Sequence, residues 1–108
     1  MELKELLDLI TNALEEKKAE DIRILPIGEI SEIADYFILA TASNPHQMEA
    51  LADLVDEKMF KAGIPVRNIE GSIREKSDWI LMDYNDIVIH IFSREGREFY
   101  HLEKIWDA

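Results

Sequence analysis

Two aspartates, Asp83 and Asp86, have the residue type and the close spacing that could do chemistry. Paired carboxylates can hold Mg²⁺ for phosphoryl or nucleotidyl transfer when both side chains point at one ion. Side chains alternate between the two faces of a strand, so this x-x spacing does not aim both carboxylates at the same ion. Nucleotidyl transfer also needs a glycine-serine turn that opens a helix, whereas Gly71-Ser72 leads into a short charged stretch before Trp79. The spacing therefore favours a turn between two strands over a metal site.

The three histidines do not form a recognisable site either. His46, His90 and His101 are too scattered for the helical or short-strand spacing of metal-ligating pairs. His90 follows an apolar run, where a hydrogen-bonded, semi-buried histidine is the default interpretation, and nothing brings a serine nucleophile to it. With no cysteine, no glycine-rich phosphate loop and no basic stripe, the sequence predicts no catalytic, cofactor-binding or metal-binding residue.

The chain has a strong excess of acidic residues, 23 Asp and Glu against 12 Lys and Arg, for a formal net charge of −11. Nucleic-acid binding draws its affinity from Lys and Arg that neutralise phosphates, so a chain this acidic is repelled by bare nucleic acid. A basic protein surface would instead attract it and raise the association rate. An acidic surface also simply aids solubility. The charge thus argues against direct nucleic-acid binding without naming a partner.

Length and composition predict one folded domain over residues 1–108. A hydrophobic content of 47% with 32% charged residues is ordinary for a globular protein of this size. No apolar stretch approaches the roughly 18 residues that a membrane span needs, and the polar start Met1–Glu5 is unlike a signal peptide. We therefore expect no membrane partner, and the absence of cysteine fits a cytoplasmic protein.

Hydrophobic spacing predicts helices alternating with strands. Apolar residues recur at helical spacing from Leu3 to about Lys18 and along Met48–Met59, and Asn44-Pro45 supplies a cap followed by a helix-starting proline. A last helix is predicted from about Glu95 to Trp106. The predicted strands are Ile22–Pro26, Tyr36–Thr41, Val66–Glu70, Trp79–Met82 and Ile87–Phe92. The expected fold class is mixed α/β, with about five strands and helices packed on the sheet, in an order that the sequence leaves open.

The strand Trp79–Met82 has two faces, and one of them must pack under the helices. Residue type alone favours burial of Trp79, because tryptophan is highly buried on average. If Trp79 and Leu81 are instead exposed, they form an apolar patch flanked by Glu70, Asp83 and Tyr84. Tryptophan and tyrosine are enriched in the residues that dominate protein–protein binding energy, so that alternative predicts an interaction surface.

The segment from Trp79 to Trp106 also carries a family resemblance. Its pattern, W-x-L-x-D-Y-x-D-x-x-x-H-x-F followed by R-x-F-Y-x-L-E-x-x-W, resembles that of the ribosomal silencing factors, the Iojap-like family. Asp35–Thr41, Ala50–Asp53 and Glu70-Gly71 are similar to further segments of that family, in the same order. Two departures are Asn85, where relatives commonly have glycine, and the helix start at Asn44-Pro45, where they have small hydroxyl residues.

The resemblance implies a binding protein rather than an enzyme. Such factors bind the large ribosomal subunit through large-subunit ribosomal protein fourteen, block joining of the small subunit and repress translation. For this chain the resemblance favours the exposed alternative. We therefore expect a contact built from Trp79, Leu81, Asp83 and Tyr84, with Glu70 and Asp86 at its rim. A homodimer is also compatible with the resemblance.

Two other classes of function stay open from the residues. The mixed-sheet pattern resembles the nucleotidyltransferase-like fold, so a divergent magnesium-dependent enzyme is one alternative. A scaffold domain that self-associates through the aromatic patch is the other. Magnesium-dependent nucleotide binding would favour the enzyme, and a concentration-dependent mass would favour the scaffold.

Overall fold

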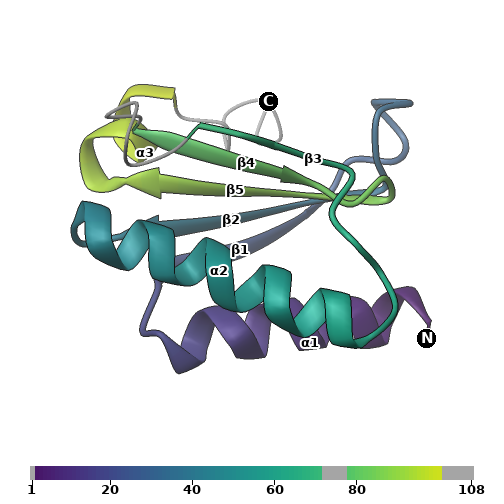
Figure 1. The fold of residues 1–108 in the computed structure, drawn as a ribbon. Helices are drawn as coiled ribbons and strands as arrows, with labels where there is room; N and C mark the ends of the chain where they lie inside the picture. Colours follow the sequence, from purple (N-terminus) through teal and green to yellow (C-terminus); the bar gives the residue numbers. More distant parts are fainter. Residues whose placement is uncertain (1, 72–77, 101–108) are drawn as a thin grey trace.

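The computed structural model describes residues 2–71 and 78–100, which form one sheet with three helices (Figure 1). Its strands are β1 (Glu20–Pro26), β2 (Tyr36–Ala42), β3 (Asn68–Glu70), β4 (Trp79–Asp83) and β5 (Ile87–Ser93). Its helices are α1 (Leu3–Glu16), α2 (Pro45–Lys61) and α3 (Arg94–Tyr100). The predicted mixed α/β class with five strands is confirmed. The part of the predicted last helix beyond Tyr100 lies outside the described residues.

The strand order is β1-β2-β5-β4-β3. Only the central pair, β2 and β5, is parallel; the other three neighbouring pairs are antiparallel. Following these directions across the sheet, β3 runs the same way as β2, although β5 and β4 lie between them. Helix α2 therefore carries the chain from the middle of the sheet to its edge.

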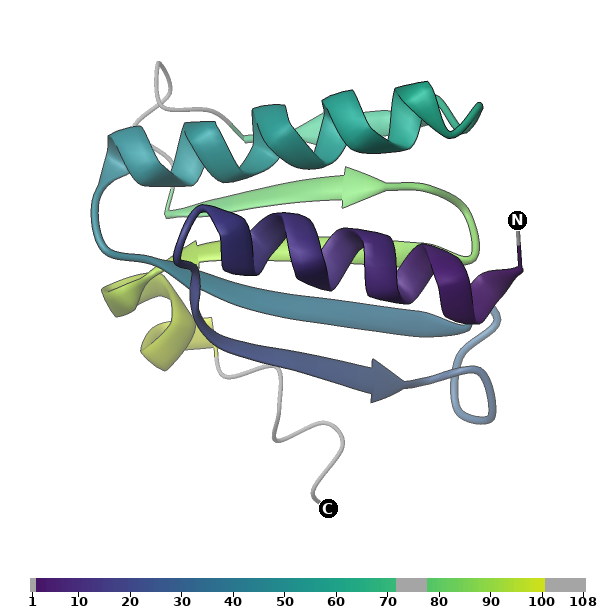
Figure 2. The same cartoon turned by 90° about the horizontal axis from the view of Figure 1, so that it is seen from below.

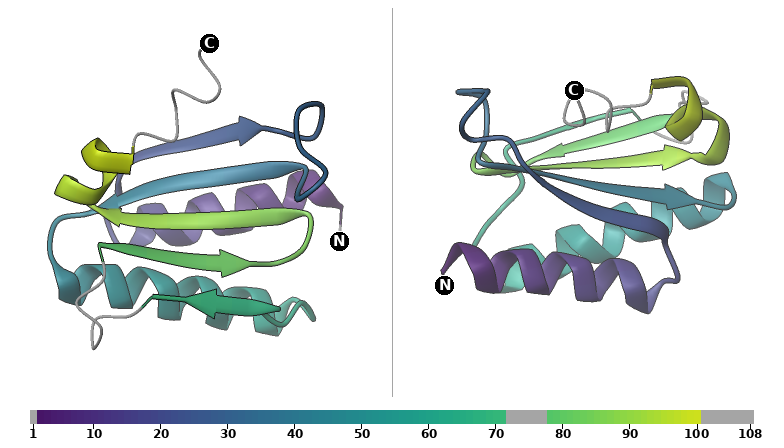
Figure 3. Two further views of the ribbon diagram at one scale, coloured as in Figure 1. Left: turned by 90° about the horizontal axis from the view of Figure 1, so that it is seen from above. Right: turned by 180° about the vertical axis from the view of Figure 1, so that it is seen from behind.

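Helices α1 and α2 lie side by side on one face of the sheet, which we call the helix face (Figure 2). Their apolar stripes pack on the strand residues that point toward them, because side chains one apart on a strand point to opposite faces. Ile38, Ile89 and Ile91 are fully buried in this larger core. The opposite face, which we call the second face, has helix α3 at one end and the loop 27–35 at the other (Figure 3).

The start of α2 is fixed by polar contacts that the sequence partly predicts. Asn44 is the N-cap, and its side chain accepts a hydrogen bond from the Gln47 backbone N–H at 2.8 Å. The Gln47 side chain then donates to the backbone carbonyls of Lys17 and Lys18, just past the end of α1. These bonds join the end of one helix to the start of the other and set how both helices sit on the sheet.

Replacing Asn44 with alanine is expected to lower the free energy of unfolding by about 1 kcal/mol. The change leaves the Gln47 N–H without its acceptor at the first turn of α2. Urea denaturation of the wild type and of Asn44→Ala measures the difference, and Asn44→Ser should retain most of the lost stability. Equal stability of all three proteins would show that the cap contributes nothing.

Candidate functional site

Strand β4 divides its side chains between the two faces as the alternation requires. Ile80 and Met82 are buried under the helices, while Trp79 and Leu81 lie on the second face and are half-buried. Across the sheet, Trp79 is in register with Phe92 of β5, and Leu81 is in register with His90. Of the two orientations that the sequence left open, the structure thus has Trp79 and Leu81 away from the main helical core.

Aromatic rings surround Trp79 on this face. The Trp79 ring stacks on Phe92 with centroids 5.2 Å apart, and Tyr100 of α3 lies 4.7 Å away on another side. The Trp79 ring also contacts the His90 ring, and His90 in turn contacts Phe37 of β2, with the His90 and Phe37 centroids 4.4 Å apart. The aromatic cluster, defined as these five residues, joins β2, β5, β4 and α3. Phe92 and His90 are buried in this cluster, whereas Trp79 is half-buried and Tyr100 is exposed, so Trp79 and Tyr100 are the rings that could contact a partner.

His90 holds the centre of the aromatic cluster in one orientation. The Trp79 indole N–H donates to His90 Nδ1 at 3.0 Å, so the neutral imidazole carries its proton on Nε2. Within the described part of the chain, the buried Nε2 has no hydrogen-bond partner. Burial lowers the pKa of His90 from 6.5 to about 4, because a charged imidazolium would lose its hydration there. His90 is therefore a neutral structural acceptor near pH 7.

Tyr84 does not join the surface where the sequence analysis expected it. Its side chain is buried and packs with the helix-face core, on the other side of the sheet from Trp79. Burial raises the pKa of the Tyr84 phenol, and the nearby charge of Asp56 adds to the effect. Tyr84 comes two residues after Met82, so the same alternation places it on the helix face with Ile80 and Met82 rather than with Trp79 and Leu81. Its contribution to a contact on the second face would be indirect.

The expected acidic contacts occupy three different positions. Glu70 is exposed on the edge strand β3 and is in register with Leu81, so it lies on the second face. Asp83 is half-buried at the end of β4, on the same face as Leu81, and Asp86 is exposed in the turn. The Asp83 side chain accepts the Asn85 backbone N–H at 2.8 Å, and Asn85 has a positive φ of 75°. Asp83 therefore stabilises the turn, as its spacing predicted.

The described residues contain no group of three or more His, Asp or Glu side chains placed to hold a metal ion. Within the same residues, no helix is long and apolar enough to cross a membrane.

Helix α3 adds two exposed rings that were not among the predicted contact residues. Tyr100, a member of the aromatic cluster, is 45% exposed, and Phe99, whose ring contacts Tyr100, is 81% exposed. Arg97 is buried and anchors the helix, with Nη1 donating to Thr41 Oγ1 at 2.9 Å and Nη2 3.3 Å from Asp21. The adjacent Phe99 and Tyr100 in the sequence indicate this surface, but the position of Tyr100 beside Trp79 follows only from the packing of α3.

Gly96 allows α3 to pack closely against the start of β4. A Cβ at this position would lie 2.6 Å from the backbone oxygen of Asp78 and 3.0 Å from its Cβ. Gly96→Ala should therefore push α3 outward, move Tyr100 from Trp79 and lower the free energy of unfolding by about 1–3 kcal/mol. Thermal unfolding and tryptophan fluorescence measure both effects. Glu95→Ala, at an exposed neighbouring position, is the matched control, and equal behaviour of the two variants would contradict the expected clash.

The fold and its surfaces define a small mixed α/β domain with an aromatic cluster on the face opposite its two long helices. The family model described as "Ribosomal silencing factor during starvation" matches residues 1–108, and the chain belongs to this family. A protein of Halalkalibacterium halodurans named "Ribosomal silencing factor RsfS" is 37% identical over 106 residues, covering 98% of this chain and 89% of that protein.

Two further comparisons extend the family relation. The crystal structure of a Chromobacterium violaceum protein matches with a TM-score of 0.92 and 32% sequence identity, covering 100% of this chain and 88% of that one. A mouse protein named "Mitochondrial assembly of ribosomal large subunit protein 1" is 29% identical, covering 93% of this chain and 44% of that protein. The recognition made from the sequence pattern is thus confirmed at the level of the family.

Proposed function

We propose that this protein represses translation by binding the large ribosomal subunit and blocking its association with the small subunit. The observation that carries the proposal is membership of the ribosomal silencing factor family over the whole chain. The name of the mouse relative, which refers to the large ribosomal subunit, supports the choice of subunit. The proposed docking partner is large-subunit ribosomal protein fourteen, and the proposed place of action is the cytoplasm.

The proposed contact is the second face around β4. Trp79 and Leu81 form its apolar centre, Glu70 and Asp83 lie on the same face, and Asp86 lies at the turn. Tyr84 is the first residue of the turn that follows β4 and packs in the helix-face core, so it would support this contact from the opposite face of the sheet. Half-buried aromatic side chains bordered by carboxylates suit a partner surface that combines apolar and basic residues.

The charge of the chain suits a ribosomal protein better than ribosomal RNA. A net charge of −11 repels exposed phosphates but attracts a cationic protein surface and raises the association rate. The chain needs no chemistry to repress translation in this mechanism. A large subunit that carries the protein cannot join a small subunit. The fraction of large subunits blocked in this way grows with the ratio of the protein concentration to its Kd.

Co-sedimentation with separated subunits tests this function. The purified protein is expected to sediment with large subunits and not with small subunits. Adding it to large subunits before the small subunits should reduce joining in proportion to occupancy, as followed by light scattering. Sedimentation with neither subunit, or joining that is unchanged at full occupancy, would contradict the proposal. Sedimentation equilibrium of the protein alone shows whether it also forms a homodimer.

A further inference from the structure

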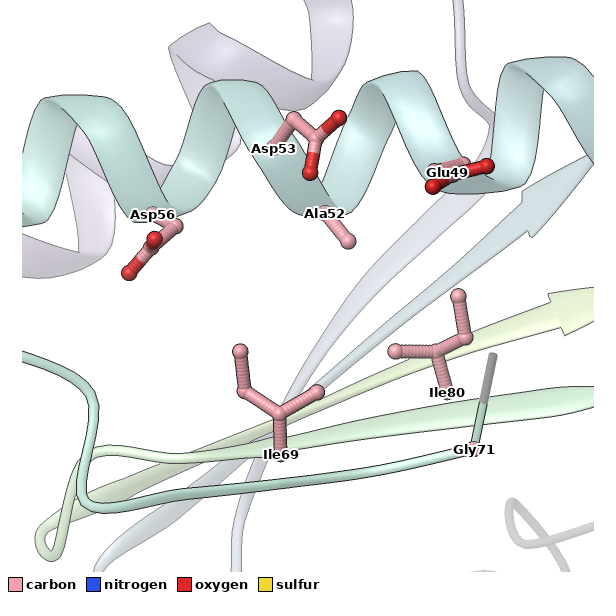
Figure 4. Close-up of a pocket in the computed structure, with 7 residues that line it drawn as sticks. All are labelled: Glu49, Ala52, Asp53, Asp56, Ile69, Gly71 and Ile80. Carbon is pink, nitrogen blue, oxygen red and sulfur yellow. The ribbon is translucent and has the colours of Figure 1, made fainter. Parts of the chain in front are cut away.

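A groove on the helix face lies between α2 and the sheet edge, away from the aromatic cluster. Its volume is about 120 Å³. Figure 4 shows Ala52 on α2 and Ile69 and Ile80 on the strands pointing toward one another across it. These three side chains form an apolar floor. Ile69 is 45% exposed, so this floor is open to solvent on the side of β3.

The groove borders a free edge of the sheet. Strand β3 is the last strand in the order and pairs only with β4, so no described strand covers its outer side. All three of its residues are exposed. An edge strand presents unpaired backbone N–H and C=O groups, which are a template for pairing with another extended segment. An extended segment added beside β3 would run along the groove.

The helix side of the groove is acidic. Glu49, Asp53 and Asp56 of α2 line it, and within the described residues none of them forms an ion pair. Other acidic residues of the chain do have cationic partners, such as Glu20 with Arg94 and Glu57 with Lys61. Three unpaired carboxylates beside an apolar floor would be complementary to a segment with alternating cationic and apolar side chains.

We infer that this groove is a second protein-docking site, which takes an extended cationic segment of a partner protein as an added strand beside β3. Apolar side chains of that segment would contact Ile69, the exposed part of the floor, while its lysine or arginine side chains would pair with the α2 carboxylates. None of the side chains that line the groove is proposed for subunit binding, although the added strand would pair with the backbone of β3, which includes Glu70. Failure of this site would therefore leave the proposed ribosomal function untouched, and the reverse also holds.

A peptide of alternating arginine and valine, about eight residues long, is the probe for this site. Titration into the full-length protein at low salt, followed by NMR of isoleucine methyl groups, should shift Ile69 and leave Ile22 unchanged. A peptide with glutamate in place of arginine should not bind. Shifts spread over the whole molecule, or no shifts at all, would overturn the inference.

Two matched double variants separate the groove from the general negative charge. Asp53→Asn with Asp56→Asn is expected to weaken peptide binding about tenfold. Glu5→Gln with Asp8→Asn removes the same charge from exposed positions of α1 and should weaken binding much less. Ile69→Ser, which changes no charge, should also weaken it. Equal weakening by both double variants, or wild-type binding by Ile69→Ser, would overturn the inference.

Discussion

Replacing Trp79 with alanine is expected to weaken binding to the large ribosomal subunit by on the order of 2 kcal/mol or more, about thirtyfold in Kd. The indole is the largest side chain at the centre of the proposed contact, and it is half-buried rather than sealed in the core. It is held in place by Phe92, Tyr100 and the hydrogen bond to His90. A preorganised aromatic side chain loses little entropy on binding, so its removal should cost more than that of any rim residue.

Trp79→Ala also removes packing inside the protein, so stability must be measured beside affinity. Loss of the ring contacts is expected to lower the free energy of unfolding by about 3 kcal/mol. Trp79→Phe keeps a ring against Phe92 and is the conservative control. Co-sedimentation titrations with large subunits give the affinities, and circular dichroism shows that each variant is folded. A folded Trp79→Ala protein with wild-type affinity would contradict the prediction. If Trp79→Ala unfolds, a folded Trp79→Phe protein with unchanged affinity would contradict it instead.

The second large effect is a loss of stability in acid caused by His90. Its pKa is about 4 in the folded protein, against an ordinary value of 6.5 in the unfolded chain. Between these values the unfolded chain binds a proton that the folded protein does not. The free energy of unfolding should therefore fall as the pH drops from about 6.5 to about 4, by about 3 kcal/mol in total from this residue. Below that range both states are protonated, and His90 adds no further slope.

His90→Gln isolates this contribution, because glutamine does not titrate and its side-chain oxygen can still accept the Trp79 indole N–H. Urea denaturation at a series of pH values gives the free energy of unfolding of both proteins. The wild type should lose about 3 kcal/mol more than His90→Gln between about pH 7 and pH 4. Parallel pH profiles for the two proteins would show that His90 is not the acid-sensitive group.

Much of the fold followed from local patterns in the sequence. The alternation in Trp79–Met82 predicted two distinct faces, and Asn44-Pro45 marked the start of α2, because capping and alternation are set by neighbouring residues. The turn at Asp83–Asp86 was predicted for the same reason, and its backbone contacts confirm it. These features depend on interactions within a few residues, which the sequence shows directly.

Other features depend on contacts between distant segments. The strand order requires β5 to lie between β2 and β4, and no local pattern specifies that pairing. Tyr84, by contrast, lies with the helix-face core as the local alternation through Ile80 and Met82 requires, although its residue type suggested an exposed contact. The burial of Arg97 depends on two residues far away in sequence. Thr41 accepts a hydrogen bond from its guanidinium, and Asp21 forms an ion pair with it. Sequence reasoning therefore identified the candidate surface but not every side chain that faces it.

The most direct test of the central claim compares one residue on each side of the sheet in binding to isolated large subunits. Leu81→Ser removes apolar surface beside Trp79, whereas Phe60→Ser removes an exposed ring of α2 on the helix side. Neither change alters the charge of the protein. We predict that Leu81→Ser loses most of the co-sedimentation with large subunits and that Phe60→Ser keeps it. Full binding by a folded Leu81→Ser protein, or loss only in Phe60→Ser, would contradict a contact through the second face.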